Sequence, residues 1–343
     1  MRLSNVKSAL TYDDIQLVPA YSEIESRQHI DLSTKLTTNY SIRLPFIASP
    51  MDTVCDSEMA IAIAELGGIG CIHRFMTIDQ QGKEVEKVKT YTRGYDGSTH
   101  HVMAAIGANG DYFERAFELV TKGANIILID VAHGHHSFVR DAIIRLKREL
   151  PSSVDIIAGN VATEKGARDL EAWGADAIRV GIGGGSLCTT RIKTGFGVPN
   201  VTSLMECSDA VKVPVLACGG IRSSGDIAKA LASGASSVIL GSLLAGTKEA
   251  PGAIIEKSNG LYKRYRGAAS LETKSVHNQV KRNVEGESTV IPFKGGVKFI
   301  VESLTDGLRS ALSYAGATRI SEFMPEFVVV TNAGMAEARP HLL

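Results

Sequence analysis

Eight short runs of consecutive apolar residues recur along the first 245 residues, most of them ending in Gly, Ser, Asp or Asn. Their hydrophobicity is continuous rather than alternating, which is typical of strands buried on both faces, as in a parallel sheet. Segments with helical periodicity lie between them, and several of these end in a glycine at the C-cap position. The predicted strands span 44–49, 67–73, 101–107, 125–130, 154–159, 176–181, 213–220 and 237–242, and the predicted helices include 56–67, 111–123, 163–174 and 224–234.

This alternation of eight strands with helices predicts an α/β fold, namely a (β/α)8 TIM barrel rather than a doubly wound sheet. No G-x-G-x-x-G motif follows the first strand, so the sequence does not indicate a Rossmann half. We expect one barrel domain over residues 1–343. In such a barrel the functional side chains lie at the C-terminal ends of the strands and in the loops that follow them.

The chain continues for about 90 residues beyond the last predicted strand. Residues 262–295 are polar and charged with little periodicity, and a long irregular excursion of this kind is usually a lid or a disordered segment. Residues 297–316 then show the apolar stripe of an amphipathic helix. We therefore predict a C-terminal lid followed by a helix.

Composition narrows the class of protein. Lys plus Arg equals Asp plus Glu at 37 each, and this balance argues against a nucleic-acid-binding protein. No apolar run reaches the roughly 18 residues of a membrane span, and the N-terminus lacks a signal-peptide core, so the expected location is the cytoplasm. The five cysteines are widely spaced without a CxxC pair, which favours reduced thiols over a disulfide framework or a zinc site.

Glycine-rich turns follow the last two predicted strands, at Gly219–Gly220 and at Gly241–Ser242. Such turns direct backbone N–H groups and helix N-termini toward an anion, so we predict a phosphate site there. The alternative is that these glycines only form tight turns between strands and helices.

The stretch GIGGGSLCTT, residues 181–190, crowds glycines and hydroxyls around one thiol. A cysteine in such a loop is either a small buried apolar residue or a nucleophile. Ser186, Thr189 and Thr190 offer donors that stabilise a thiolate, so we interpret Cys188 as a candidate nucleophile.

Three histidines cluster in the stretch DVAHGHHS, at His133, His135 and His136. The spacing is not that of an HExxH motif and no carboxylate lies four residues on, which disfavours a metal site. Asp130 and His133 are expected instead to contact a polar ligand at the mouth of the barrel.

Eleven segments together make the chain similar to the inosine-monophosphate dehydrogenase/guanosine-monophosphate reductase family. The resemblance covers nearly the whole chain, and the GSxCTT loop is highly specific. The segments are LTYDDIQLVPAYSEI (10–24), ASPMDTV (48–54), GGIGCIHR (67–74), IDVAHGH (129–135), AGNVAT (158–163), GSLCTTRIKTGFGVPN (185–200), GGIRSSGDIAKAL (219–231), LGSLLAGTKEAPG (240–252), YRGAAS (265–270), IPFKG (291–295) and FVVVTNAGMAEARPH (327–341).

The resemblance implies a homotetrameric barrel that binds a purine nucleotide and a nicotinamide dinucleotide. Cys188 matches the nucleophile that attacks purine C2, Thr190 the hydroxyl beside it, and Glu285 a lid acid paired with that threonine. The resemblance leaves open a K+ site on the backbone of Gly183, Gly185 and Cys188. Asp130, Ala132 and His133 match cofactor contacts, and the substrate contacts match Ser49, Met51, Asn160, Ser186, Cys218, Gly219, Gly220, Gly241, Ser242, Tyr265, Gly267, Ala268 and Ala269.

The lid bears on which reaction the resemblance implies. Only about 28 residues separate the second and third strands, so the CBS modules of most dehydrogenases are absent. The lid runs 20 residues from Tyr265 to Glu285 without an Arg-Tyr pair, and VEGES (284–288) resembles the reductase lid. These features favour a GMP reductase that uses NADPH. The N-terminal segments and the AGMAEARPH tail look more like an IMP dehydrogenase that uses NAD, and a catalytically silent nucleotide-binding homologue is a third reading.

One departure from the family pattern concerns the sugar. The family has an aspartate that binds both ribose hydroxyls, and this chain has Cys218 at that position, in ACGG. A thiol is a weak hydrogen-bonding partner for a diol. We therefore expect altered sugar recognition, with tolerance of a 2′-deoxynucleotide.

Overall fold

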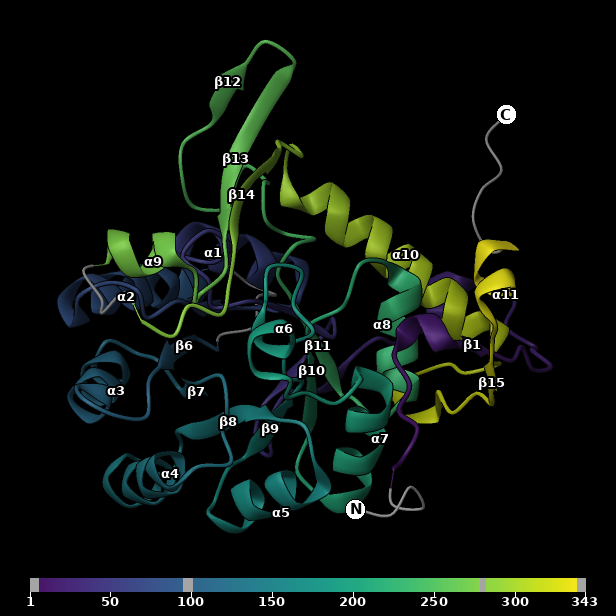
Figure 1. Ribbon diagram of the computed structural model, residues 1–343, viewed down its shortest axis with the longest axis horizontal. Coiled ribbons are helices and arrows are strands. Elements are labelled where there is room, and N and C mark those ends of the chain that lie inside the picture. Colours follow the sequence, from purple (N-terminus) through teal and green to yellow (C-terminus); the bar gives the residue numbers. More distant parts are fainter. Residues whose placement is uncertain (1–5, 95–100, 278–281, 338–343) are drawn as a thin grey trace.

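A closed barrel of parallel strands forms the centre of the computed structural model, which describes residues 6–94, 101–277 and 282–337 (Figure 1). The strand order around the barrel is β10-β11-β4-β5-β6-β7-β8-β9. Each predicted strand is confirmed, and the (β/α)8 fold with them. The strands are β4 (Phe46–Ala48), β5 (Ile69–Ile72), β6 (Met103–Ile106), β7 (Ile126–Asp130), β8 (Asp155–Val161), β9 (Ala177–Val180), β10 (Val215–Cys218) and β11 (Ser237–Leu240).

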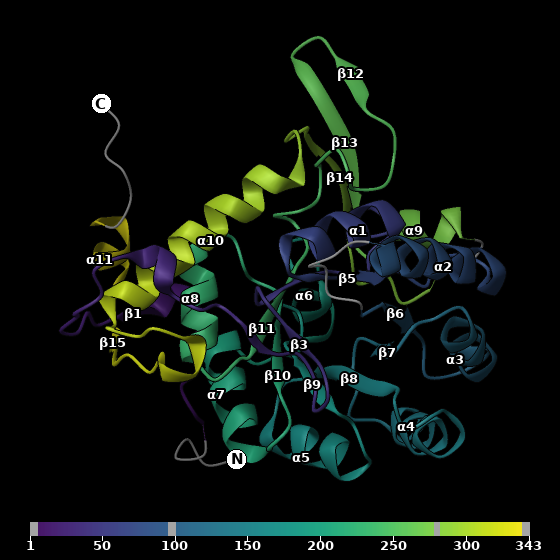
Figure 2. The same cartoon turned by 180° about the vertical axis from the view of Figure 1, so that it is seen from behind.

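Helices surround the barrel, as the two opposite views show (Figures 1 and 2). Local signals set their ends: the Asp56 side chain accepts a hydrogen bond from Glu58 N at the start of α1, and Gly67 ends that helix at φ 101°. The helices between the strands are α1 (Ser57–Leu66), α2 (Ile78–Gly94), α3 (Tyr112–Thr121), α4 (Ser137–Glu149), α5 (Glu164–Ala172), α6 (Thr190–Thr194), α7 (Asn200–Ala210) and α8 (Ser224–Ala232).

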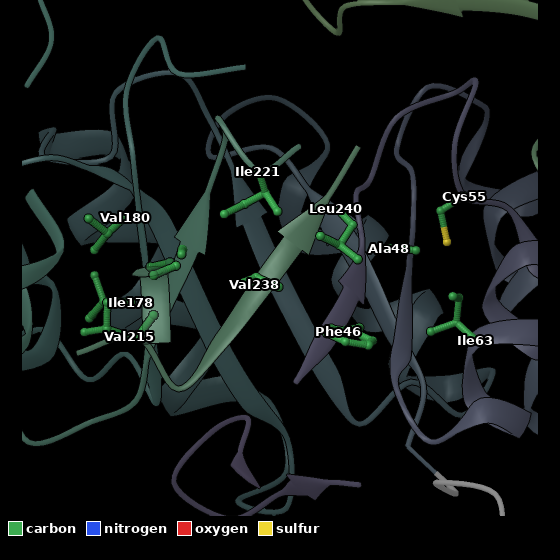
Figure 3. Packing of buried hydrophobic residues seen from close by; sticks show 14 of the residues in the cluster. Phe46, Ala48, Cys55, Ile63, Ile178, Val180, Val215, Ile221, Val238 and Leu240 are labelled. Atoms are coloured by element: carbon green, nitrogen blue, oxygen red, sulfur yellow. The ribbon is translucent and has the colours of Figure 1, made fainter. Parts of the chain in front are cut away.

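Two hydrophobic layers explain why the strands read as continuous apolar runs. Ile239 of β11 belongs to the cluster inside the barrel, together with Ile47 of β4. Val238 and Leu240 face the opposite way and pair in register with Phe46 and Ala48, in the layer between barrel and helices (Figure 3). Both faces of each strand are therefore buried, which removes the polar alternation of a half-exposed sheet.

A short hairpin, β2 (Thr34–Lys35) with β3 (Ser41–Ile42), closes the N-terminal end of the barrel. Its side chains Leu36 and Ile42 belong to the cluster inside the barrel. The backbone N–H of Thr38 donates to the carbonyl of Asp176, just before β9, at 3.0 Å. The opposite, C-terminal end is thus the one that holds a site.

The predicted lid is more regular than its sequence pattern suggested. β12 (Ile255–Lys257), β13 (Gly260–Arg266) and β14 (Ser288–Pro292) form an antiparallel sheet that projects from the barrel, and α9 (Leu271–Val276) follows β13 (Figure 1). The expectation of an irregular segment over 262–295 was wrong because Lys263 occupies a buried strand position. Its ammonium donates to backbone carbonyls, including that of Thr247 at 3.1 Å, which makes burial of the charge possible. A charged residue therefore stands where the alternation of apolar and polar residues in a strand would have an apolar one.

The predicted C-terminal helix is α10 (Val297–Tyr314), which packs against α8. Outside the barrel, β1 (Ile15–Leu17) pairs with β15 (Phe327–Val329). In the part of the chain that the structure describes, no helix has the length and apolarity that crossing a bilayer requires. The remaining elements are the 3-10 helices η2 (Tyr12–Asp14), η3 (Arg27–His29) and η4 (Ile320–Glu322), and α11 (Asn332–Glu337).

Candidate active site

A cavity of about 350 Å³ lies at the C-terminal ends of the barrel strands, under the lid. Its wall contains all the predicted site residues except His133, which is exposed and does not line it. The lining set from the predictions is Ser49, Met51, Asp130, Ala132, Asn160, Gly183, Gly185, Ser186, Cys188, Thr190, Cys218, Gly219, Gly220, Gly241, Ser242, Tyr265, Gly267, Ala268, Ala269 and Glu285.

Cys188 lies in the loop between β9 and α6 and is half-buried. Its Sγ donates to Thr190 Oγ1 at 3.2 Å, and that hydroxyl in turn donates to Glu285 Oε2 at 2.7 Å. Thiol, hydroxyl and carboxylate therefore form a continuous chain along which a proton can leave the sulfur.

The segment 285–287 is held between two other segments by its backbone. The N–H of Thr189 donates to the Glu285 carbonyl at 2.9 Å, and the N–H of Glu287 donates to the Leu187 carbonyl at 2.9 Å. On the other side, the N–H of Glu285 donates to the Ala269 carbonyl at 3.2 Å. The loop that carries Cys188 and the segment that carries Glu285 are thus fixed relative to each other by main-chain hydrogen bonds.

The glycine-rich turn after β10 depends on the absence of side chains. Gly219 and Gly220 have φ of 91° and 78°, and a Cβ on Gly219 would lie 2.8 Å from the carbonyl carbon of Gly184. The turn therefore packs directly against the loop that carries Cys188. Helix α8 begins shortly afterwards, with Ser223 as its N-cap.

The turn after β11 differs from the prediction. Residues 242–252 form turns and bends rather than the start of a helix, so the expected helix N-terminus at Gly241–Ser242 was wrong. Gly246, Pro251 and Gly252 interrupt this stretch, which disfavours a helix. In its place, the ammonium of Lys294 donates to the Ser242 carbonyl at 2.5 Å and brings a cation to the turn.

Tyr265 reaches the cavity from β13, on the lid side. Its hydroxyl lies 3.1 Å from Ser186 Oγ, and burial raises the pKa of Tyr265, so the phenol stays protonated. A Cβ on Gly241 would be only 3.4 Å from this hydroxyl. Hydroxyls and turns from three separate segments therefore converge on one end of the cavity, and this is the arrangement that an anion requires.

Strands β7 and β9 bring an ion pair to the cavity wall, between Arg179 of β9 and Asp130 of β7. Burial alone would lower the pKa of Arg179, but the neighbouring Cys218 and Asp130 more than offset this and raise it, so the guanidinium stays charged. Beside this pair, Asn160 Nδ2 donates to the Gly181 carbonyl at 2.6 Å.

Sequence reasoning missed several charged or aromatic residues of the cavity lining, namely Arg179, Arg74, Phe75 and the lid residue Lys274. The guanidinium of Arg74 lies 5.1 Å from the centre of the Phe75 ring. The available signal was a charged residue in or directly after an apolar strand run, in AIRV and in GCIHR. Burying a charge at such a position costs folding free energy unless the charge is paired with an opposite charge or a ligand.

The histidine cluster does not form a metal centre in the described residues, which contain no grouping of three or more His, Cys, Asp or Glu arranged to hold an ion. His135 Nε2 instead lies 2.7 Å from Asp169 Oδ2 on α5.

Comparisons with known proteins agree with this geometry. A family model described as "IMP dehydrogenase / GMP reductase domain" matches residues 9–341. The inosine-5′-monophosphate dehydrogenase of Cryptosporidium parvum is 39% identical over 397 residues, covering 99% of this chain and 97% of that protein. That of Borreliella burgdorferi is 38% identical over 394 residues, covering 98% and 97%. A crystal structure of GMP reductase from Trypanosoma brucei in complex with guanosine 5′-monophosphate superposes with a TM-score of 0.93 at 29% identity, over 99% of both chains.

Proposed function

The chain belongs to the IMP dehydrogenase / GMP reductase family, whose members are NAD(P)-dependent oxidoreductases, and on this premise we propose that it reduces GMP with NADPH to IMP and ammonia. The observation that supports this most directly is the hydrogen-bonded chain from Cys188 through Thr190 to Glu285. It joins a nucleophile of the barrel to an acid of the lid.

The hydrogen-bonded series of Cys188, Thr190 and Glu285 can carry out a deamination. The thiol proton passes through Thr190 to the Glu285 carboxylate, and the Cys188 thiolate forms a bond to purine C2 while the π pair of the C2=N3 bond moves to N3. Glu285 then gives the proton to the exocyclic amine, the C2–N bond breaks and ammonia leaves. Once C2 has gained a hydride, the C2=N3 double bond forms again, the C2–S bond breaks, and the released Cys188 thiolate takes a proton from solvent.

The cofactor wall fits a nicotinamide. The Arg179–Asp130 pair and the Asn160 amide offer both donors and acceptors for a carboxamide, and Ala132 lies beside them. NADPH, when bound there, supplies the hydride. His133 lies outside this wall, so we assign it no contact with the reacting ring.

We assign the 5′-phosphate to the part of the cavity where hydroxyls and glycine-rich turns meet. Ser186, Tyr265 and the turns at Gly219–Gly220 and Gly241–Ser242 surround that part. The family's K+ would be held by carbonyls of Gly183, Gly185 and Cys188. The Gly185 carbonyl already accepts from Cys188 N at 3.0 Å, and its second lone pair remains for an ion.

The lid supports the reductive direction. An oxidation to XMP needs a base that activates water, whereas the stretch from Tyr265 to Glu285 carries no Arg-Tyr pair. Deamination needs an acid at the amine, and Glu285 is placed for that role. The second candidate is IMP oxidation with NAD, which the names of the curated relatives favour.

One assay separates these activities, following the absorbance of the reduced cofactor. We expect consumption with GMP plus NADPH; production with IMP plus NAD would identify a dehydrogenase, and no change in either would identify a nucleotide-binding homologue. Cys188→Ala is expected to abolish turnover in either direction. Retained turnover in that variant would overturn the covalent mechanism.

We further propose that the sugar site tolerates a 2′-deoxynucleotide. Cys218 lies at the end of β10 beside Arg179, where a thiol is a weak acceptor for ribose hydroxyls. We expect kcat/KM for GMP and dGMP to lie within about tenfold of each other, and Cys218→Asp to increase the preference for GMP. A preference for GMP of more than about a hundredfold in the natural chain would contradict this.

A homotetrameric assembly and a cytoplasmic location are part of the same proposal. Light scattering on the purified protein tests the first and fractionation of its native cells the second.

A further inference from the structure

Lys274 is a cation in the cavity wall that hydrogen-bonds only backbone carbonyls among the described residues. It lies on α9, in the lid. Its ammonium donates to the carbonyl of Asn283 at 2.8 Å and to that of Arg282. The described residues contain no carboxylate that forms an ion pair with it.

The two carbonyls that Lys274 binds lie two and three residues before Glu285. Asn283 has a φ of 53°, a left-handed conformation that non-glycine residues rarely adopt. The side chains of Arg282 and Asn283 are both exposed, so packing contributes little to holding this turn. The bonds from Lys274 therefore restrain the chain just before the acid, in addition to the main-chain bonds that Glu285 itself makes.

We propose that Lys274 is a positioning residue for Glu285. By binding the turn at Arg282 and Asn283, its ammonium sets where the chain enters the cavity. The carboxylate of Glu285 then meets Thr190 at 2.7 Å. This role rests on the proposed function, in which Glu285 moves the proton between thiol and leaving group.

A purely structural role predicts something different. If Lys274 only stabilised the end of α9, its removal would lower the midpoint of thermal unfolding and leave the chemistry of Glu285 unchanged. If it positions Glu285, its removal changes kcat only while that carboxylate is present.

The kinetic test is a double-mutant cycle of Lys274→Met with Glu285→Gln, in whichever direction the natural chain turns over. Lys274→Met removes the charge-assisted hydrogen bonds to Arg282 and Asn283 and should lower kcat about tenfold, while KM for the nucleotide changes less than about threefold. In the Glu285→Gln background the same substitution should have no further effect. Lys274→Arg should restore most of kcat, and Lys165→Met, on the exposed surface of α5, serves as the matched control. An equal loss of kcat in both backgrounds, or none in either, overturns the proposal.

A second measurement does not depend on activity. Hydrogen exchange at the Glu285 and Glu287 amides, which donate to Ala269 and Leu187, reports on the position of the segment. Lys274→Met should speed this exchange about tenfold relative to the natural chain and to Lys165→Met, and Lys274→Arg should reverse it. Unchanged exchange overturns the positioning role. A natural chain that is inactive in both directions overturns the proposed function instead.

Discussion

Replacing Gly219 by alanine tests the contact between the turn after β10 and the nucleophile loop. The added Cβ would lie 2.8 Å from Gly184 C and 2.9 Å from Gly185 N, both of them backbone atoms, at a φ of 91°. The left-handed backbone costs an alanine about 1–2 kcal/mol, and an overpacked contact costs about 1–3 kcal/mol. A rigid site would therefore lose about 2–5 kcal/mol of folding free energy.

The loop will relieve part of this strain by moving away from the turn, and this movement carries Ser186 and Cys188 with it. A displacement of about 1 Å at reacting groups costs about a hundredfold in rate. We therefore expect Gly219→Ala to reduce kcat/KM about a hundredfold and to lower the urea midpoint of unfolding.

Gly225 provides a matched control on α8. A Cβ there meets only Ser223 Oγ at 3.6 Å, an ordinary contact in an ordinary helical conformation. Gly225→Ala should leave kcat/KM unchanged and increase stability by about 0.5 kcal/mol. If Gly219→Ala matched Gly225→Ala in both rate and urea midpoint, the proposed packing of turn against loop would be wrong.

Two further predictions concern stability. Burial lowers the pKa of His73 from 6.5 to about 4, so the unfolded chain binds one more proton between these values. The free energy of unfolding should therefore fall by up to about 3 kcal/mol as the pH drops from 6.5 to 4. In a plot of urea midpoint against pH, His73→Asn should have a shallower slope than the natural chain. An unchanged slope would exclude His73 as the cause. Lys263→Met should cost about 2–3 kcal/mol because it leaves the carbonyls of Thr247, Lys248 and Ala250 without their donor, and a urea midpoint equal to that of the natural chain would contradict this.

The sequence predicted those parts of the molecule whose pattern reflects burial of apolar groups. The barrel strands were found because both faces are apolar, as Val238 and Ile239 illustrate on β11. Strand β13 was missed because its buried Lys263 is satisfied by carbonyls from distant residues, a partnership that no local pattern reveals. The family resemblance brought Thr190 and Glu285 together across 95 residues, and the structure has them in contact.

Two features of the site that the sequence did not reveal have the same physical origin. Arg179 reads as an interruption of an apolar strand until Asp130, on a different strand, is seen to neutralise it. The loop after β7 leaves His133 exposed and outside the cavity lining, so its predicted contact with the cofactor stays a prediction. Pairings between strands and the direction of a loop depend on tertiary packing, and short-range patterns do not encode them.

The main-chain hydrogen bonds of segment 285–287 have a consequence for which side chains this segment can carry. Those hydrogen bonds join backbone atoms of Leu187, Thr189 and Ala269, so they do not depend on which side chains the segment carries. In the proposed mechanism the barrel carries the Cys188 thiol and most of the nucleotide site, whereas Glu285, which protonates the leaving group, lies on this lid segment. Exchanging the side chains of this segment would leave its main-chain hydrogen bonds in place, so we expect such changes to alter the chemistry of the lid without unfolding the barrel.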